Sequence, residues 1–534
     1  MTTTTADVVV AGAGHNSLIT AAYLARAGYE VVVLDARSIP GGGAASEELL
    51  LPGYRLDSCS TGHTLIQTNP LLRDDELGLL SEYGLEYLVP DPFAHVAFPD
   101  GRQLTMWMDP ERSCEEIARF SHADADAYRR MLADYDEVKG VFGAATFTPP
   151  GFGPSLEQRL AEHPRGRIWQ RKRLMSAWDV IRHEYESEHI RAFMLWQAFQ
   201  TLVPVDMPGS GQLASSIVFG RQRRSWTLPR GGSGALTDAL VRFIEDHGGA
   251  VLCDRPVGSL VLEGGRCAGV ETEAGERFLA REAVVSTIHV KHLLDMAPPE
   301  CWDEDFRYGV ETFDVGFSGF AVYIASTEAP VFETEDGPRS AVSAGLVGFP
   351  QQVIDHQRAL RDGRYHDDVA WLLVATPTLV DETRAPDGHH TVKFLSAQPW
   401  LEGDRWEGLK ARQAQRQLER VRRFCPALTD DAILAMHAKS PVDIEAQNRH
   451  MIRGTFHGGD RTIAQSGALR PAPGWGQYRM PIPGLYQTGG TTHPGGSITG
   501  APGRNAATVV LQDLGLDLEE VVGGARRPRA GSHR

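Results

Sequence analysis

The stretch that most constrains the fold spans residues 7–17 and reads Asp-Val-Val-Val-Ala-Gly-Ala-Gly-His-Asn-Ser. Its pattern predicts a short apolar strand over 8–10, a glycine turn and a helix over 17–26. A second apolar strand is predicted over 31–34 and ends on Asp35. This order is typical of the βαβ unit that opens a dinucleotide-binding fold. A glycine turn in an unrelated α/β protein is the alternative, and the full succession favours the nucleotide site.

Several residues of this pattern have a predicted role. Gly12 permits the tight turn, and Gly14 lets backbone N–H groups approach a pyrophosphate at the positive end of the helix. Asp35 is placed to accept hydrogen bonds from an adenosine ribose. Ser17 replaces the third glycine of the pattern, so we expect helix and strand to lie slightly further apart. The glycines at 41–43 have bare backbone N–H groups that are suited to donate hydrogen bonds to a dinucleotide longer than NAD. A flexible loop is the alternative.

Composition narrows the class of protein. A chain of 534 residues is expected to form two domains or one interleaved pair. Its net charge of −16 argues against a nucleic-acid partner and disfavours anionic lipid, although peripheral membrane contact stays open. We see no apolar run of membrane-spanning length and no signal sequence, and we expect a cytoplasmic protein. The six cysteines form no C-x-x-C motif, so we expect reduced thiols and no metal site.

The middle of the chain changes from a helical to a β-type pattern. Apolar residues recur every three or four positions over 124–140 and 176–199, which predicts helices. The second helical stretch carries a stripe of aromatic residues, which we interpret as core in preference to the wall of an apolar pocket: Trp178, Tyr185, Phe193, Trp196 and Phe199. Residues 251–286 resemble a meander of strands that returns to the first βαβ sheet. An α+β substrate domain is predicted from β-type runs over 315–325, 371–376 and 391–397 and a charged helix over 407–424.

The C-terminal part contains a second glycine-rich loop. A strand over 485–488 is followed by the loop and then by a helix over 501–514, whose N-terminus faces an anion or a dipole. The basic, glycine-rich tail over 523–534 predicts disorder.

Taken together, these motifs resemble the phytoene-desaturase-like branch, related to phytoene dehydrogenase and carotenoid isomerase, of the FAD-dependent amine-oxidase and desaturase superfamily. The resemblance covers nearly the whole chain. Its residues are the Gly-Ala-Gly-His-Asn opening, 42–48, 231–236, 456–458 and, most specifically, 470–475, 492–496 and 500–505. Ser17 and Ser497 depart from the pattern, and the second is expected to alter contacts to the flavin.

The resemblance implies an α/β fold with a discontinuous, glutathione-reductase-type (Rossmann-like) FAD domain and an inserted α+β substrate domain. The FAD domain is expected to comprise residues 1–110, 215–300 and 440–522, and the substrate domain 111–214 and 301–439. FAD is expected to bind non-covalently. The residues expected to hold it are Gly12, Gly14, His15, Asn16, Asp35, Ala36, Arg37, Gly42, Gly43, Ala44, Val257, Ser286, Gly490, Gly496, Ser497 and Ile498.

The resemblance also implies the reaction. Such proteins move a hydride from an apolar substrate carbon to flavin N5, and thereby introduce or shift a C=C bond. We expect a lipid-like or secondary-metabolite small molecule as substrate. The electron acceptor stays open between oxygen, a quinone or another acceptor. An FAD-dependent amine oxidase, with an aromatic cage that the sequence does not place at Trp475 or Tyr478, and a non-redox escort or binding protein are the alternatives. Intact glycines at both ends of the FAD site argue against the escort.

Candidates for proton transfer come from position along the chain. His493 lies beside the expected flavin loop, and His63 and Asp57 follow the segment that leaves the pyrophosphate. Each has an equally weighted alternative role, which is to hold loop backbone. For the cluster of Arg221, Arg223 and Arg224, a solvated surface is favoured over a site for an acidic substrate group.

Overall fold

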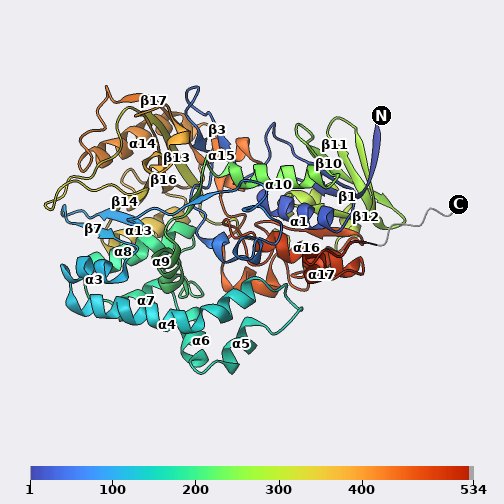
Figure 1. Cartoon of the computed structure of the whole chain (residues 1–534), viewed down its shortest axis with the longest axis horizontal. Coiled ribbons are helices and arrows are strands. Elements are labelled where there is room, and N and C mark those ends of the chain that lie inside the picture. Colours follow the sequence, from blue (N-terminus) through green and yellow to red (C-terminus); the bar gives the residue numbers. More distant parts are fainter. Residues whose placement is uncertain (1, 528–534) are drawn as a thin grey trace.

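The computed structural model describes residues 2–527 and has a large β-sheet at each end of the molecule (Figure 1). The first sheet has the strand order β10, β11, β12, β1, β2, β9, and β18 also pairs with β12. Its strands are β1 (Thr3–Ala11), β2 (Val31–Leu34), β9 (Ala250–Leu252), β10 (Val257–Glu263), β11 (Arg266–Thr272), β12 (Arg277–Ser286) and β18 (Leu485–Gln487).

The centre of this sheet is parallel. β1 pairs in parallel with β2 and β12, and β12 pairs in parallel with β18. The residues of β2 and the second half of β1 are buried, as expected of strands covered on both faces. The pairing of β12 with β1 confirms that the meander returns to the first sheet. The carboxyl ends of these strands therefore meet at one edge, where α/β folds bind their ligands.

One face of the first sheet is covered by three helices that share a hydrophobic cluster with it. They are α1 (His15–Arg26), α10 (Gly234–Asp246) and α16 (Ala501–Asp513). A Cβ atom on Gly503 would lie 2.4 Å from the carbonyl oxygen of Asn16, so α16 packs closely against α1. The N- and C-terminal glycine motifs are thereby joined in space (Figure 1).

The second sheet has the strand order β17, β13, β16, β15, β14, β6, β7. Its strands are β6 (Ala94–Ala97), β7 (Gln103–Met106), β13 (Gly319–Ser326), β14 (Ser343–Val347), β15 (Trp371–Ala375), β16 (His390–Ala397) and β17 (Ile433–Lys439). β6 and β7 lie within residues 1–110, which the sequence assigned to the FAD domain. This boundary is corrected, because β6 pairs in parallel with β14.

A layer of helices packs beside the second sheet (Figure 1). It consists of α3 (Pro110–Ala118), α4 (His122–Thr146), α5 (Leu156–Glu162), α6 (Gly166–Leu174), α7 (Ala177–Glu184), α8 (Glu188–Ala198) and α9 (Leu213–Arg224). Phe193, Trp196 and Phe199 are fully buried in its core, which confirms the core interpretation of the aromatic stripe. α9 packs into the same cluster through Val218 and Phe219, although the predicted FAD segment began at residue 215.

The remaining α-helices and strands complete the fold. They are α2 (Pro70–Arg73), α11 (Val290–Leu293), α12 (Glu304–Glu311), α13 (Pro350–Arg361), α14 (Arg405–Arg422), α15 (Pro441–Gln447), α17 (Leu518–Val522), β3 (Ser46–Glu47), β4 (Leu56–Asp57), β5 (Tyr87–Leu88) and β8 (Leu228–Pro229). Among residues 2–527, no helix has both the length and the apolar character that crossing a membrane requires.

The start of the predicted disordered tail is ordered. The backbone N–H of Arg527 donates to the carbonyl of Ala27 at 2.9 Å, and its guanidinium pairs with Asp7 at 2.5 Å. The prediction of disorder is therefore wrong for 523–527, because these contacts fasten the segment to the first sheet. Residues 528–534 lie outside the described part of the chain.

Candidate functional site

A cavity of about 800 Å³ is lined by both sheets. We call the part formed by Gly12, Gly14, Asp35 and their neighbours the nucleotide end. We call the part formed by side chains of η2 (Phe199–Thr201), α9, the second sheet and the segments next to them the apolar end; its residues include Leu202, Ile217, Trp226, Leu373 and Leu395. The predicted nucleotide residues thus open into a continuous space that reaches the predicted substrate domain.

Two glycines of the nucleotide end, Gly12 and Gly42, leave little room for a side chain. Gly12 follows β1 with a φ of +99°, and a Cβ atom there would lie 2.5 Å from Thr287 Cγ2. A Cβ atom on Gly42 would lie 3.3 Å from Gly14 Cα. The N–H of Gly41 donates to the carbonyl of Ala13 at 2.7 Å. The second glycine cluster is therefore fastened against the first turn, which argues against the flexible-loop alternative.

The N-terminus of α1 faces the cavity through His15 and Asn16. The hydroxyl of Ser17 donates to the carbonyl oxygens of Gly12 and Gly14, at 2.5 and 2.9 Å, so the serine that replaces the third glycine closes the turn internally. The Oδ1 atom of Asn16 is buried and has no hydrogen-bond partner. An unpaired buried acceptor is costly, so a donor from a bound ligand is expected there.

Asp35 is held at the tip of β2 by two backbone groups. The N–H of Ala13 donates to Oδ2 at 2.7 Å and that of Arg37 donates to Oδ1 at 2.8 Å. Burial raises the pKa of Asp35, and these two hydrogen bonds only partly offset the effect. Ala36 and Arg37 also line the cavity, and Arg37 pairs with Glu47 at 2.8 Å.

The C-terminal loop lines the cavity with Gly490, Gly496, Ser497 and Ile498, four of the residues expected to hold FAD. A Cβ atom on Gly496 would lie 2.1 Å from the carbonyl oxygen of His457, so this position is also closed to side chains. Ser497 has a φ of +85° and its hydroxyl accepts from Arg461 at 3.0 Å. The helix α16 begins four residues after Ser497, at Ala501.

A buried arginine braces this loop. Arg470 is fully buried and donates to the carbonyl of Gly490 from Nε at 3.1 Å and from Nη2 at 2.5 Å. It also donates to the carbonyls of Asp460 and Gln465, at 2.6 and 3.2 Å. Burial lowers the pKa of Arg470 to about 9. The sequence singled out this arginine within a motif without a role, and the structure shows that it fixes the loop.

Of the remaining residues expected to hold FAD, Gly43 and Val257 line the cavity, whereas Ala44 and Ser286 do not. Ala44 is fully buried and its carbonyl accepts from Thr237 at 3.3 Å. The hydroxyl of Ser286 accepts from the N–H of Ile288 at 3.1 Å. Their chain neighbours Gly43, Thr287 and Ile288 line the cavity.

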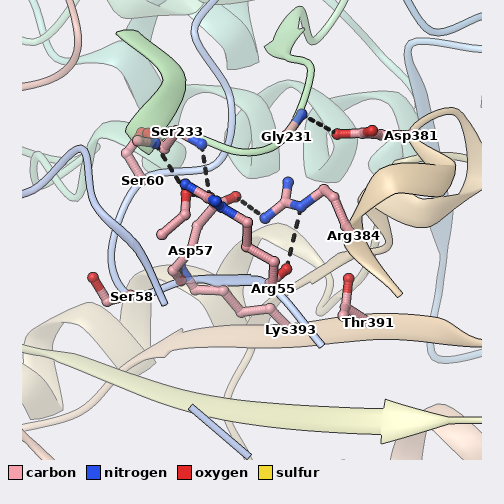
Figure 2. Close-up of polar contacts among 12 residues, drawn as sticks. Arg55, Asp57, Ser58, Ser60, Gly231, Ser233, Asp381, Arg384, Thr391 and Lys393 are labelled. Atoms are coloured by element: carbon pink, nitrogen blue, oxygen red, sulfur yellow. Dashed lines mark hydrogen bonds and ion pairs between the residues drawn. The ribbon is translucent and has the colours of Figure 1, made fainter. Parts of the chain in front are cut away.

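None of the three candidates for proton transfer is among the cavity-lining residues. Asp57 forms an ion pair with Arg384 at 2.7 Å and accepts from the N–H of Ser233 at 2.8 Å (Figure 2). Burial opposes the charge on Asp57, but Arg384 and the hydrogen bonds outweigh it and lower its pKa. Asp57 therefore joins β4 to the turn before α10, and its catalytic assignment is corrected to a structural one.

The two histidines are also structural. His63 Nε2 lies 2.6 Å from Ser233 Oγ, and burial lowers the pKa of His63 to about 3. His493 Nε2 lies 2.9 Å from the carbonyl oxygen of Ala145, and burial lowers its pKa to about 4. Both imidazoles are neutral at pH 7 and poor bases. His493 contacts backbone, as in the structural alternative, whereas His63 contacts the side chains of Ser233 and Tyr87.

Sequence reasoning missed several cavity residues. His289, His450 and His457 line the cavity, and burial is the main cause that lowers the pKa of each of them. Only His457, in the motif at 456–458, had any sequence signal. Arg221 also lines the cavity and is 6% exposed, so the favoured interpretation of a solvated cluster is wrong for this arginine. Arg223 remains exposed, as expected.

The residues present fit FAD. The crowded glycines leave backbone N–H groups accessible to a pyrophosphate at the start of α1, and Asp35 lies where an adenosine ribose is expected. The unpaired Oδ1 of Asn16 supplies an acceptor beside them. The braced loop at 496–498 borders the same cavity, so an extended dinucleotide meets both glycine motifs.

Comparisons with known proteins agree with this geometry. The profile described as "Flavin containing amine oxidoreductase" matches residues 18–511. One component of the limonene dehydrogenase of Castellaniella defragrans is 27% identical, over 96% of this chain and 95% of that protein. The lycopene-forming phytoene desaturase of Pantoea ananas is 26% identical, over 95% of this chain and 99% of that protein. The structure of cyclohexylamine oxidase from Brevibacterium oxydans shares the fold, with a TM-score of 0.58 and 16% identity over 96% of this chain and 99% of that one. The chain therefore belongs to the family of flavin containing amine oxidoreductases, and FAD is its cofactor.

Proposed function

We propose that this protein dehydrogenates an apolar, lipid-like or secondary-metabolite substrate and thereby introduces or shifts a C=C bond. The observation that carries the proposal is that one continuous cavity joins a nucleotide end that fits FAD to an apolar end. Two relatives that match nearly the whole chain are named for the dehydrogenation of limonene and the desaturation of phytoene.

The chain's own residues position the reactants and exclude water. When bound, FAD supplies the acceptor for a hydride that leaves a substrate carbon. Leu202, Ile217 and Trp226 place apolar side chains against the substrate and keep water from the reacting bond. The buried histidines at the cavity are neutral at pH 7, so they add hydrogen-bonding atoms without adding charge.

FAD binding is proposed to be non-covalent. Cys59 lines the cavity, but burial raises the pKa of its thiol to about 11, so the reactive thiolate is scarce at neutral pH. Acid precipitation is expected to release all the flavin into the supernatant. Yellow colour that stays with the precipitated protein would contradict non-covalent binding.

The amine-oxidase alternative gains no support from Trp475 and Tyr478. Tyr478 is buried and donates its hydroxyl to the carbonyl of His493, and Trp475 donates to Asp303 at 3.2 Å. Neither aromatic ring lines the cavity, so these two residues form no aromatic cage there.

Anaerobic reduction of the FAD-loaded enzyme tests the proposed function. Limonene and phytoene are mixed with the protein in a stopped-flow instrument, with putrescine and cyclohexylamine as matched amine probes. We expect a hydrocarbon to bleach the flavin absorbance and the amines to leave it unchanged. Bleaching by the amines alone would overturn the proposal. Reoxidation of the reduced protein by dissolved oxygen or by a soluble quinone then identifies the class of electron acceptor.

A further inference from the structure

Arg221 brings a buried positive charge to the apolar end of the cavity. It lies on α9, it is 6% exposed, and it borders the same space as Ile217 and Trp226. Its guanidinium carbon lies 6.0 Å from the centre of the Trp226 ring. A buried cation in such surroundings is costly unless it is compensated, so its partners decide what it does.

Only neutral side chains compensate this charge. Arg221 donates from Nη1 to Gln197 Oε1 at 2.8 Å and from Nη2 to Gln200 Oε1. Within residues 2–527, no carboxylate forms an ion pair with Arg221. Burial lowers its pKa to about 9, which still leaves it protonated at pH 7.

The same cluster has more hydrogen-bond donors than acceptors. Both glutamine side chains use their oxygen atoms for Arg221, and their Nε2 atoms are buried without a partner. An arginine has five N–H donors, and these two hydrogen bonds use only two of them. Gln197 is 1% exposed, and Gln200 borders the cavity with its Nε2 atom buried. The unused Nε2 donors of the two glutamines are therefore not hydrogen-bonded to bulk water. The cluster therefore lacks an acceptor, preferably a charged one.

We propose that Arg221, supported by Gln197 and Gln200, binds a carboxylate on the end of the otherwise apolar substrate. A carboxylate carries one negative charge and matches the planar guanidinium, whereas a phosphate brings more charge than this guanidinium balances. Lys393 of β16 also lines the cavity, but its ammonium already donates to the carbonyls of Asp57 and Cys59. This inference rests on the proposed function in one respect, because it takes the apolar end as the substrate site. Within the proposed class of apolar substrates, it identifies apolar acids as the preferred ligands.

Binding of decanoate and of its uncharged counterpart decan-1-ol tests the site. Each is titrated into the oxidised, FAD-loaded enzyme, and the change in the visible flavin spectrum reports binding. We expect the wild-type enzyme to bind decanoate at least tenfold more tightly than decan-1-ol. Arg221→Gln should weaken decanoate binding tenfold or more and change decan-1-ol binding less than twofold. Arg221→Lys keeps the charge without the planar guanidinium. Its affinity for decanoate should lie between the affinities of the wild-type enzyme and of Arg221→Gln.

Arg223→Gln is the matched control, because Arg223 lies on the same helix, is exposed and does not line the cavity. This variant should bind decanoate more tightly than decan-1-ol to the same extent as the wild-type enzyme. A wild-type enzyme without preference for decanoate, or an equal loss of both ligands in Arg221→Gln, would overturn the proposal. If Arg221→Gln fails to retain FAD, the wild-type preference and Arg221→Lys still decide the question. Ligand binding needs no turnover, so failure of hydrocarbon oxidation and failure of the carboxylate site are separate results.

Discussion

The two ends of the cavity are built by different means. At the nucleotide end and in the C-terminal loop beside it, bare glycine backbone forms the wall: added Cβ atoms on Gly12, Gly42 and Gly496 would lie 2.5, 3.3 and 2.1 Å from neighbouring atoms. At the apolar end, side chains such as Ile217 and Arg221 form the wall. Backbone-built sites tolerate no added atoms, whereas side-chain-built sites can lose atoms and keep their shape. Substitutions at the two ends should therefore have separate effects on FAD retention and on substrate binding.

The largest effect is expected for Gly12→Ala. The new Cβ atom would collide with Thr287, and the φ of +99° is unfavourable for any residue with a side chain. We expect the purified protein to lose nearly all its FAD, measured as flavin absorbance per protein after desalting.

Gly101→Ala controls for the backbone conformation alone. Gly101 has a φ of +90° in the turn between β6 and β7, and nothing lies within 4 Å of an added Cβ atom. The Gly101→Ala variant should lose about 1 kcal/mol of folding stability and retain its full FAD content. Loss of FAD in both variants to the same extent would show that the crowding at Gly12 is not the cause.

A smaller effect is expected for Asp35→Asn. The substitution removes the charge from the hydrogen bonds of this side chain, and each such bond is worth about 1.5–3 kcal/mol. We expect FAD to bind about tenfold to hundredfold more weakly, measured by fluorescence titration of the apoprotein. Unchanged affinity would contradict the ribose assignment.

The pH dependence sharpens the same experiment. Because burial raises the pKa of Asp35, its carboxylate takes up a proton at a higher pH than an ordinary aspartate does. On acidification the wild-type affinity for FAD should therefore fall before ordinary aspartates titrate, whereas Asp35→Asn should show no such fall in that pH window. Parallel profiles for the two proteins would exclude Asp35 as the titrating group.

The smallest effect is expected for Ile217→Ala at the apolar end. Each buried methylene is worth about 0.8 kcal/mol, so a partly lost contact should weaken decan-1-ol binding about threefold to tenfold. FAD content should stay at the wild-type level, because Ile217 lies on α9 and belongs to neither glycine motif. Ile168→Ala, at an exposed position, is the control. A loss of FAD in Ile217→Ala would break the separation of the two ends.

The sequence predicted the nucleotide end far better than the rest of the site. Most residues expected to hold FAD line the cavity, since a glycine turn, a helix start and a strand end are local features that short patterns encode. The proton-transfer candidates failed because nearness along the chain was used in place of nearness in space. Asp57 is paired with Arg384, and His493 with the backbone of Ala145; both partners are remote in sequence.

By itself, the sequence determined the opening βαβ unit, the two glycine loops, the return of the meander to the first sheet and the identity of the cofactor. Only the tertiary structure decided that β6 and β7 join the second sheet, that Arg470 braces the C-terminal loop and that Arg221 is buried at the cavity. The physical reason is that turn geometry and strand periodicity depend on neighbouring residues, whereas strand pairing and charge burial depend on which distant segments pack together.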